Sequence, residues 1–514
     1  MTLAKTILRN TLSNWMGMLI STAITILLTP YLLKHLGSER YGIYSLAFSV
    51  LHYLVLLEFG MRGAVARFAA KYIQADDPQS LSGVVSVAMM FSVLLGSLSI
   101  LLSYGIGYVA LDFFNVSSNY RTQTLVLFVA MGVNLAFSLL SYSLSGVLIG
   151  SQRYDLENVK IILTGLINAS LVVLFFSLGW VSLSSWAAAM VLASLVGQIY
   201  LFITARFLQP KLRIGFSKIR LEILKEMLGF GGWNVFLQVA TLVTSSVNPI
   251  IIGRILGSAV VPFYSIPYML VTRLQSGISG LTSTLMPYAS AALNTGDKTM
   301  LAHLLKKGTY TAALLLFPLG GCLMVMCKDL FRVWLPQEFE PYWFVFAILM
   351  TAYFGTITQT TSYYILLGGG EIKGLSIVYL AESLVIIILS IVLMKNYAFG
   401  VYGAAAALAI PRFLSTCLFQ PWYTCRQVGI RFGTYMLESY LQPALCTIPS
   451  LILAGLLLYF FPPGSLFVWI LEYVLALVPF AILGVAGVYS LPILNNLPAY
   501  LADYIRKKQD LKNC

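Results

Sequence analysis

The feature that most limits the fold is a series of apolar segments, most of them about 20 residues or longer. A helix of about 20 residues crosses a hydrocarbon core of ~30 Å. In lipid every backbone amide needs a partner within the protein, which leaves helices or closed barrels, and segments this long favour helices. The sequence therefore predicts an all-α membrane protein with fourteen spanning helices, at residues 11–33, 41–60, 83–108, 122–148, 159–178, 183–206, 228–253, 260–287, 309–327, 342–367, 374–394, 399–425, 439–461 and 465–490.

The composition agrees with a membrane environment. Charged residues make up 10% of the 514 residues, whereas a soluble protein averages about 25%. Lys and Arg are concentrated in alternate loops and in the tails, so the positive-inside rule predicts that both termini are cytoplasmic. We expect a multi-pass protein of the cell inner (plasma) membrane. Topology and anionic membrane lipids explain the net charge of +13 without nucleic acid.

The sequence contains no pattern that indicates an enzyme. Its six cysteines form no C-x-x-C pair, and the glycine-rich segment 368–374 lacks the Gly-Lys-Ser/Thr ending of a phosphate-binding loop. We expect no catalytic residues, no cofactor and no metal site, and we expect the cysteines to pack between helices.

One short segment occurs twice. Residues 36–45 read "LGSERYGIYS" and residues 256–265 read "LGSAVVPFYS", an offset of 220. Six predicted helices lie between the two, and an even number makes the copies parallel repeats, related by an axis along the membrane normal. We therefore predict an N-lobe at 1–206, a cytoplasmic amphipathic linker at 207–227, a C-lobe at 228–427, and two further helices with a basic cytoplasmic tail at 428–514.

A polar stripe also recurs at this offset. Its members lie seven and eleven residues apart, on one face of a helix. Hydrogen bonds between helices explain single Ser and Thr residues, but a matching stripe in both copies favours a wet cavity between two lobes that open on alternate sides. The stripe consists of Asn14, Ser21 and Thr25 in the first copy and of Asn234, Thr241 and Ser245 in the second, where Gln238 and Asn248 extend the same face.

Three charged residues lie near the inner end of the second helix. Glu58 and Arg62 are four residues apart, the spacing of an ion pair along a helix. A structural role for this pair is the simpler interpretation. We expect Arg67 to contact headgroup phosphates or the inner mouth of the cavity.

Two opposite charges are predicted at one depth in neighbouring helices. Glu382 and Arg412 lie fifteen residues on either side of a turn near Tyr397. Because a charge without a partner is costly in lipid, an ion pair is expected. A role in coupling, with Glu382 as a proton or Na⁺ site, stays open.

Arg273 lies near mid-membrane with polar rather than acidic sequence neighbours. The planar guanidinium suits a phosphate, so Arg273 is a candidate for binding a ligand anion. His52 lies at the matching depth in the first copy, where either a helix contact or a cavity role is possible.

Several segments resemble the polysaccharide transport (oligosaccharide flippase) family of the multidrug/oligosaccharidyl-lipid/polysaccharide exporter superfamily. They include "TLSNWMGMLISTAITILLTPYLLKHLGSERYGIYSLAFSV", "EFGMRGAVARFAAKY", "GVLIGSQRYDLENVK", "LMPYASAALNTGD" and "AESL". The resemblance implies fourteen helices, two six-helix lobes and a cationic central cavity. It also implies movement of a lipid-linked oligosaccharide to the outer leaflet for O-antigen, capsule or exopolysaccharide assembly. The implied partners are that lipid-linked oligosaccharide, membrane lipids, a polysaccharide polymerase and other assembly proteins.

Three alternatives stay open. A cation-coupled multidrug exporter relies on acidic residues in its lobes, and the first lobe here has no carboxylate at mid-membrane. Lipid II flippases resemble one another in several arginines of the first helices, whereas the first span after Arg9 has none. A membrane scaffold without transport activity is the third alternative.

Overall fold

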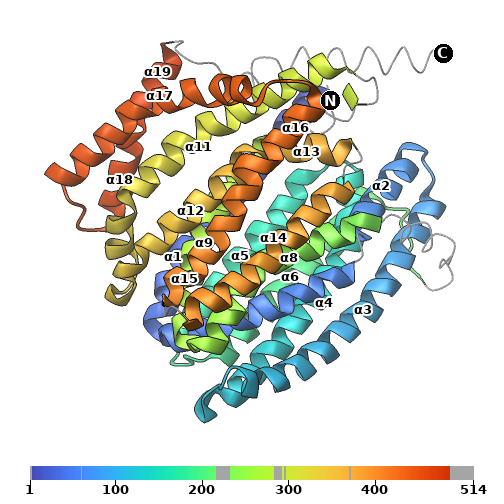
Figure 1. Cartoon of the computed structure of the whole chain (residues 1–514). Coiled ribbons are helices and arrows are strands. Elements are labelled where there is room, and N and C mark those ends of the chain that lie inside the picture. Colours follow the sequence, from blue (N-terminus) through green and yellow to red (C-terminus); the bar gives the residue numbers. More distant parts are fainter. Residues whose placement is uncertain are drawn as a thin grey trace, which may run out of the picture. The chain divides into compact units, whose positions relative to one another are not determined.

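The computed structural model describes residues 3–58, 61–215, 232–282, 292–293, 297–369, 372–396 and 399–486. These residues form helices and no strand (Figure 1). Twelve of the described segments are long and apolar enough to cross a membrane. The first of them, Ser13–Gln74, contains two predicted spans on either side of a bend at Gly37, and α9 covers the described part of predicted span 260–287. The predicted all-α, multi-pass fold is confirmed.

The helices fall into two compact units. The first unit comprises Met1–Ser265 with Met394–Gly400. Its elements are α1 (Leu3–Leu51), the 3₁₀ helix η1 (His52–Glu58), α2 (Met61–Gln74), α3 (Pro78–Phe113), η2 (Ser118–Tyr120), α4 (Arg121–Gly150), α5 (Tyr154–Ser177), α6 (Leu183–Leu208), α8 (Gly232–Ile255) and η4 (Ser258–Val260). Thus α8, the first helix of the second repeat copy, packs with the first unit. The lobe boundaries predicted from the repeat stay a prediction.

The second unit comprises Ile266–Leu393 and Val401–Cys514. Helix α9 (Pro262–Thr282) leads into it from the first unit. Its other elements are α11 (Lys298–Trp334), η6 (Gln337–Tyr342), α12 (Trp343–Thr358), α13 (Thr360–Gly368), α14 (Ile372–Ile391), α15 (Gly400–Phe413), the π-helical η8 (Leu414–Phe419), α16 (Gln420–Val428), α17 (Phe432–Phe460), α18 (Leu466–Ala476) and α19 (Val478–Val485). The π-helical η7 (Val392–Asn396) is divided between the two units at Leu393.

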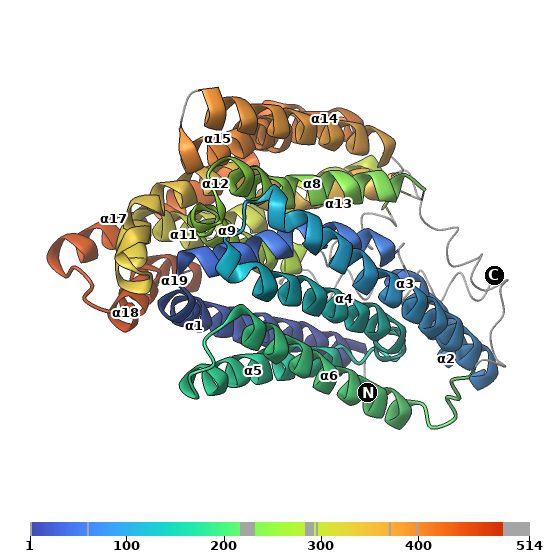
Figure 2. The same cartoon turned by 90° about the horizontal axis from the view of Figure 1, so that it is seen from below.

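Small residues let α3 and α4 of the first unit pack closely along their length (Figure 2). A Cβ added to Gly132 would lie 2.6 Å from Oγ of Ser103, and one added to Gly96 would lie 3.0 Å from Cβ of Ala136. Ser99 donates a hydrogen bond of 3.2 Å to the carbonyl of Gly132. Close backbone approach and hydrogen bonds between helices stabilise helix pairs in lipid, where the hydrophobic effect does not drive their association.

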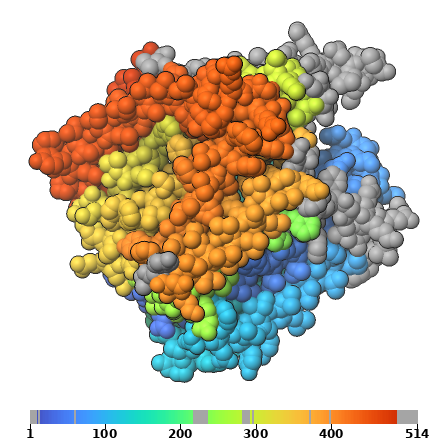
Figure 3. Space-filling model, viewed as in Figure 1, coloured from blue at the N-terminus to red at the C-terminus, as the bar shows by residue number. Residues whose placement is uncertain are grey.

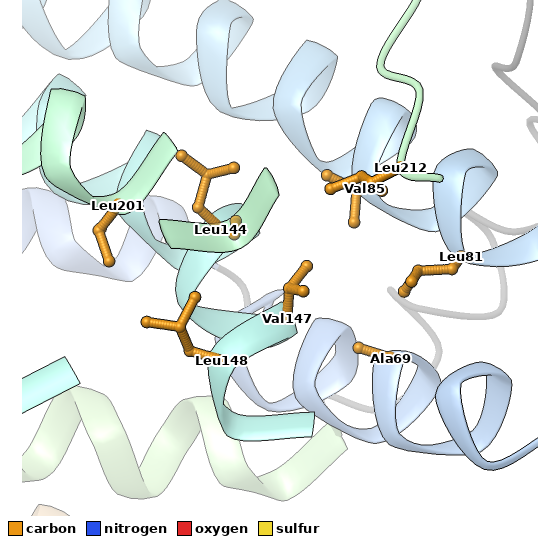
Figure 4. Packing of buried hydrophobic residues seen from close by; sticks show 9 residues of the cluster. Ala69, Leu81, Val85, Leu144, Val147, Leu148, Leu201 and Leu212 are labelled. Atoms are coloured by element: carbon orange, nitrogen blue, oxygen red, sulfur yellow. The ribbon is translucent and has the colours of Figure 1, made fainter. Parts of the chain in front are cut away.

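A buried apolar cluster holds the adjoining ends of α2, α3, α4 and α6 together (Figure 4). Leu212, which follows α6, is 3% exposed within this cluster. The backbone N–H groups of Arg213 and Gly215 donate to the hydroxyls of Ser82 and Ser86 at 3.0 and 3.1 Å. Residues 207 and 208 of the predicted linker end α6, and residues 209–215 form no helix and are fastened to α3. Residues 216–227 lie outside the described part of the chain, so the amphipathic linker stays a prediction.

The second predicted span differs from the structure at its C-terminal end. Residues His52–Glu58 form a 3₁₀ helix, and α2 continues to Gln74, beyond the predicted end at residue 60. The reason is that the apolar residues of α2 lie on one face of the helix, while its charged residues lower the mean hydropathy of the segment. Met61, Val65 and Phe68 pack into a buried cluster, while Arg62 and Arg67 are exposed.

The outer faces of the second unit are apolar, as lipid contact requires. Figure 3 shows part of this unit, with α14 in orange and α17 in red-orange. Exposed apolar side chains on these two helices include Leu384, Val385, Ile388, Leu437, Leu441, Leu445 and Ile452.

Candidate functional site

The repeated segment forms the same backbone bend in both copies. Gly37 has φ 78° and ψ 168°, and Gly257 has φ 93° and ψ 162°. A positive φ with an extended ψ is essentially restricted to glycine. The Leu-Gly-Ser pattern thus specifies a bend within α1 and an equivalent bend between α8 and α9.

The two bends contact each other within the first unit. Ser265 donates a hydrogen bond of 3.2 Å to Ser45, its equivalent at the 220-residue offset. Gly42 lies against Pro262, its equivalent at the 220-residue offset. A Cβ added to Gly42 would be 3.2 Å from Cδ of Pro262 and 1.8 Å from the carbonyl oxygen of Ser258. Equivalent residues meet in this way where a two-fold axis passes. The internal repeat is therefore visible locally at this contact, and its parallel orientation in the membrane stays a prediction.

Residues of the polar stripe in the first copy form hydrogen bonds with neighbouring residues of the first unit. Thr25 donates to the carbonyl of Ser21 at 2.9 Å. Asn14 is exposed and accepts a hydrogen bond of 2.5 Å from the amide of Asn158 on α5.

The stripe of the second copy lies on α8. Gln238 and Thr241 are exposed, and Thr241 donates to the carbonyl of Leu237 at 2.9 Å. Ser245 is half-buried and donates to the carbonyl of Leu242 at 3.1 Å, whereas the side chain of Asn234 lies outside the described part of the structure. The wet cavity that the stripe predicts stays a prediction.

His52 joins the two repeat copies. Its Nδ1 lies 3.0 Å from Oγ of Ser246 on α8, and Ser246 is 2% exposed. Because His52 begins η1, this contact fixes the start of the 3₁₀ segment. The geometry supports a helix contact, the simpler of the two interpretations of this residue.

Glu58 and Arg62 belong to a larger cluster than the sequence predicts. Glu58 ends η1 and Arg62 lies in the first turn of α2, so the two residues are not spaced along one α-helix. The guanidinium of Arg62 lies over the ring of Tyr142, 5.6 Å from its centroid. Glu58 interacts with Arg62 and with the hydroxyl of Tyr142 on α4. This cluster joins η1, α2 and α4.

The two remaining arginines differ in exposure. Arg67 is exposed on α2, as a headgroup contact requires. Arg273 lies in α9, half-buried, and interacts with another group of the protein. Its role in binding an anion stays a prediction.

In the second unit, Glu382 on α14 and Arg412 on α15 form a buried ion pair. Nε of Arg412 lies 2.7 Å from Oε1 of Glu382, with side-chain exposures of 9% and 3%. Ser415 donates a hydrogen bond of 2.5 Å to Oε2 of Glu382. Ser415 lies in the π-helical segment η8, and π-bulges inside helices occur frequently at functional sites.

A chain of polar contacts that the sequence does not predict continues from this pair. The guanidinium of Arg412 lies 5.6 Å from the ring centroid of Tyr379, whose hydroxyl donates to Gln420 at 3.2 Å. Gln420 donates to the carbonyl of Gln359 at 3.1 Å, and the Gln359 amide donates to Tyr440 on α17 at 2.7 Å. The signal in the sequence was the presence of Gln359 and Gln420 within apolar predicted helices, where polar side chains need partners.

A polar cavity in the first unit was also missed. It has a volume of about 350 Å³ and lies between α4, α5 and α6. Lys160 is its charged lining residue, and amide or hydroxyl side chains supply most of the remaining polar lining. The amides Asn134, Asn168 and Gln198 lie in three different predicted spans, so only the tertiary structure brings them together.

Comparison with known proteins agrees with this membrane fold. The chain is 21% identical to a protein of Shigella flexneri named "Putative O-antigen transporter", over 81% of this chain and 98% of that protein. It is 21% identical to the "Probable low-salt glycan biosynthesis flippase Agl15" of Haloferax volcanii, over 88% of this chain and 89% of that protein. A solved multidrug resistance MATE family transporter of the MOP superfamily, in an inward-facing conformation, has the same fold, with a TM-score of 0.66, 15% identity, and coverage of 81% of this chain and 94% of that one.

The family model described as "Polysaccharide biosynthesis protein" matches residues 7–293. This match covers more than half of the 514 residues, including both bends and the stripes of both copies. The chain therefore belongs to the polysaccharide biosynthesis protein family of multi-pass membrane proteins.

Proposed function

We propose that this protein is a flippase that moves a polyprenyl-diphosphate-linked oligosaccharide from the inner to the outer leaflet of the plasma membrane. The product would serve the assembly of a cell-surface polysaccharide. The names of its relatives, an O-antigen transporter and a glycan biosynthesis flippase, support this assignment.

The physical need for such a protein follows from the sugar. Each hydroxyl costs about 4–8 kcal/mol to move into hydrocarbon without a hydrogen-bond partner. A head group of several sugars therefore crosses a bilayer at a negligible rate unaided. Polar side chains within the membrane-spanning helices replace the lost water, and a lipid tail that stays in the bilayer needs no such replacement.

The observation that carries the proposal is the pair of equivalent glycine bends that meet at Ser45 and Ser265. Parallel repeats that meet at a local two-fold axis suit transport by alternating access, in which one repeat rocks against the other. In this mechanism the stripe residues would contact the sugars, and both termini would be cytoplasmic.

Arg273 would bind the diphosphate that links lipid and sugar. It carries a permanent positive charge, is half-buried in a spanning helix, and has a guanidinium whose planar donors match phosphate oxygens. Arg67, which is exposed on α2, would contact phosphates at the cytoplasmic entry.

Reconstitution into proteoliposomes tests the proposal. Lipid-linked oligosaccharide is placed in both leaflets, and the fraction oxidised by external periodate is followed over time. The proposal expects all of the substrate to become accessible, against about half in protein-free vesicles. Accessibility that stays at about half would contradict it, and uptake of a cationic dye such as ethidium by the same vesicles would favour a multidrug exporter.

A further inference from the structure

The polar cavity of the first unit lies between three neighbouring helices. Its lining residues come from α4, α5 and α6, and α6 packs against both α4 and α5. A Cβ added to Gly197 on α6 would lie 2.4 Å from Cγ2 of Thr164 and 3.6 Å from Cε of Lys160, both on α5. The glycine therefore lets α6 approach the two α5 residues that line the cavity.

Several polar groups of the lining are held in fixed orientations. Ser194 donates to Oδ1 of Asn134 at 2.6 Å, and Ser138 donates to the carbonyl of Asn134 at 3.1 Å. The amide nitrogen of Gln198 donates to the carbonyl of Phe137 and to the hydroxyl of Ser141. These contacts fix which side of each amide is left for a ligand.

The groups that remain include both donors and acceptors. The amide nitrogen of Asn134 and the carbonyl oxygen of Gln198 are not used in the bonds just described. Oδ1 of Asn168 is buried without a hydrogen-bond partner among the described residues. The ammonium of Lys160 supplies three donors.

We propose that this cavity binds one monosaccharide-sized, polyhydroxylated group of the transported glycan, a sugar subsite built within the first unit. A sugar ring offers many hydroxyls, each of which both donates and accepts, as this mixed lining requires. The volume of about 350 Å³ lies at the lower end of small-molecule sites and suits a single ring. This inference rests on the proposed flippase function.

Other occupants fit the lining less well. A hydrocarbon tail would leave Oδ1 of Asn168 without a hydrogen-bond partner, which is costly for a buried polar group. A metal cation would meet an ammonium group rather than a carboxylate. Water fills many polar cavities, so the test must show saturable binding of sugar.

The experiment measures saturation-transfer NMR of methyl glycosides with the full-length protein purified in detergent. The probes are the methyl glycosides of glucose, galactose, mannose, N-acetylglucosamine and glucuronic acid, with sodium acetate as an anion competitor. We expect at least one glycoside to bind saturably, and we expect that acetate does not displace it. Saturation by none of the glycosides, or their displacement by acetate alone, would overturn the proposal.

Variants locate the binding within the cavity. We expect Lys160→Met and Asn168→Leu each to weaken glycoside binding at least tenfold in protein that keeps its melting temperature. Gly197→Ala, which crowds Thr164, provides a third variant should one of these fail to fold. Lys328→Gln, at an exposed lysine of α11, is the matched control and should bind as wild type. Wild-type affinity in folded Asn168→Leu would overturn the assignment.

The outcomes separate this inference from the proposed function. Glycoside binding that depends on Lys160, together with proteoliposomes that do not flip substrate, would contradict the flippase assignment and keep the subsite. Normal flipping without saturable glycoside binding would remove the subsite alone.

Discussion

Ser265 donates a hydrogen bond of 3.2 Å to Ser45, the residue that occupies the same position 220 residues earlier in the other repeat copy. Each serine follows a glycine bend of nearly identical backbone angles, at Gly257 and Gly37. Because equivalent positions of the two copies contact each other, the repeated segments form a tertiary contact of the folded protein.

The first prediction concerns the backbone conformation of the bend at Gly257. A Cβ at Gly257 would meet no atom within 4 Å, so the cost of Gly257→Ala comes from its φ of +93° alone. Such strain costs about 1–3 kcal/mol, and we expect a lower melting temperature in detergent. Gly63→Ala is the matched control, since Gly63 also has open space but lies inside α2. There alanine should stabilise the helix by about 0.5–1 kcal/mol. Equal melting temperatures for the two variants would contradict the prediction.

The second prediction concerns topology. A reporter fused after Lys395 should read as outside the cell, and one fused after Arg220 as cytoplasmic, because basic residues remain on the cytoplasmic side. Alkaline phosphatase and green fluorescent protein fusions measure the two locations independently. The reverse pattern at either position would contradict this topology.

The third prediction concerns the Glu382–Arg412 pair. Removing one member leaves the other charge buried, which costs about 3–5 kcal/mol. We therefore expect Glu382→Gln and Arg412→Gln each to reduce the yield of folded protein, measured by size-exclusion chromatography of a fluorescent fusion. The double variant Glu382→Arg with Arg412→Glu should recover part of it. Single variants that fold normally but fail to transport would instead assign the pair to coupling.

Much of the fold could be predicted because its determinants are local. Apolar length alone defines the spanning helices, and the Leu-Gly-Ser repeat marks both bends, since only glycine tolerates their φ. The Glu382–Arg412 contact followed from equal distances to one turn. In each case a short stretch of sequence carries the physical constraint.

The remainder depends on tertiary contacts that a linear pattern does not encode. Asn134, Lys160 and Gln198 line one cavity because three helices converge, and none of their sequence neighbours indicates it. The extension of α2 depends on burial of Val65 and Phe68, which a hydropathy average over charged neighbours conceals.

The fourth prediction concerns Arg273. Hydrogen bonds to charged groups contribute about 1.5–3 kcal/mol, so Arg273→Gln should slow flipping in proteoliposomes by roughly tenfold or more. Arg273→Lys keeps the charge but loses the planar fork, and should retain intermediate activity. Arg206→Gln, at an exposed arginine of α6, serves as the control for a lost positive charge. Wild-type flipping in Arg273→Gln would exclude the diphosphate role.

The most direct test of the central claim is made in cells that depend on this protein for surface polysaccharide. Lipid-linked oligosaccharide is labelled with a radioactive sugar, and spheroplasts are treated with impermeant periodate to measure the fraction in the outer leaflet. Depletion of the protein should reduce the oxidised fraction while the total amount of lipid-linked oligosaccharide rises, and re-expression should restore it. An outer-leaflet fraction that stays unchanged after depletion would contradict the flippase assignment.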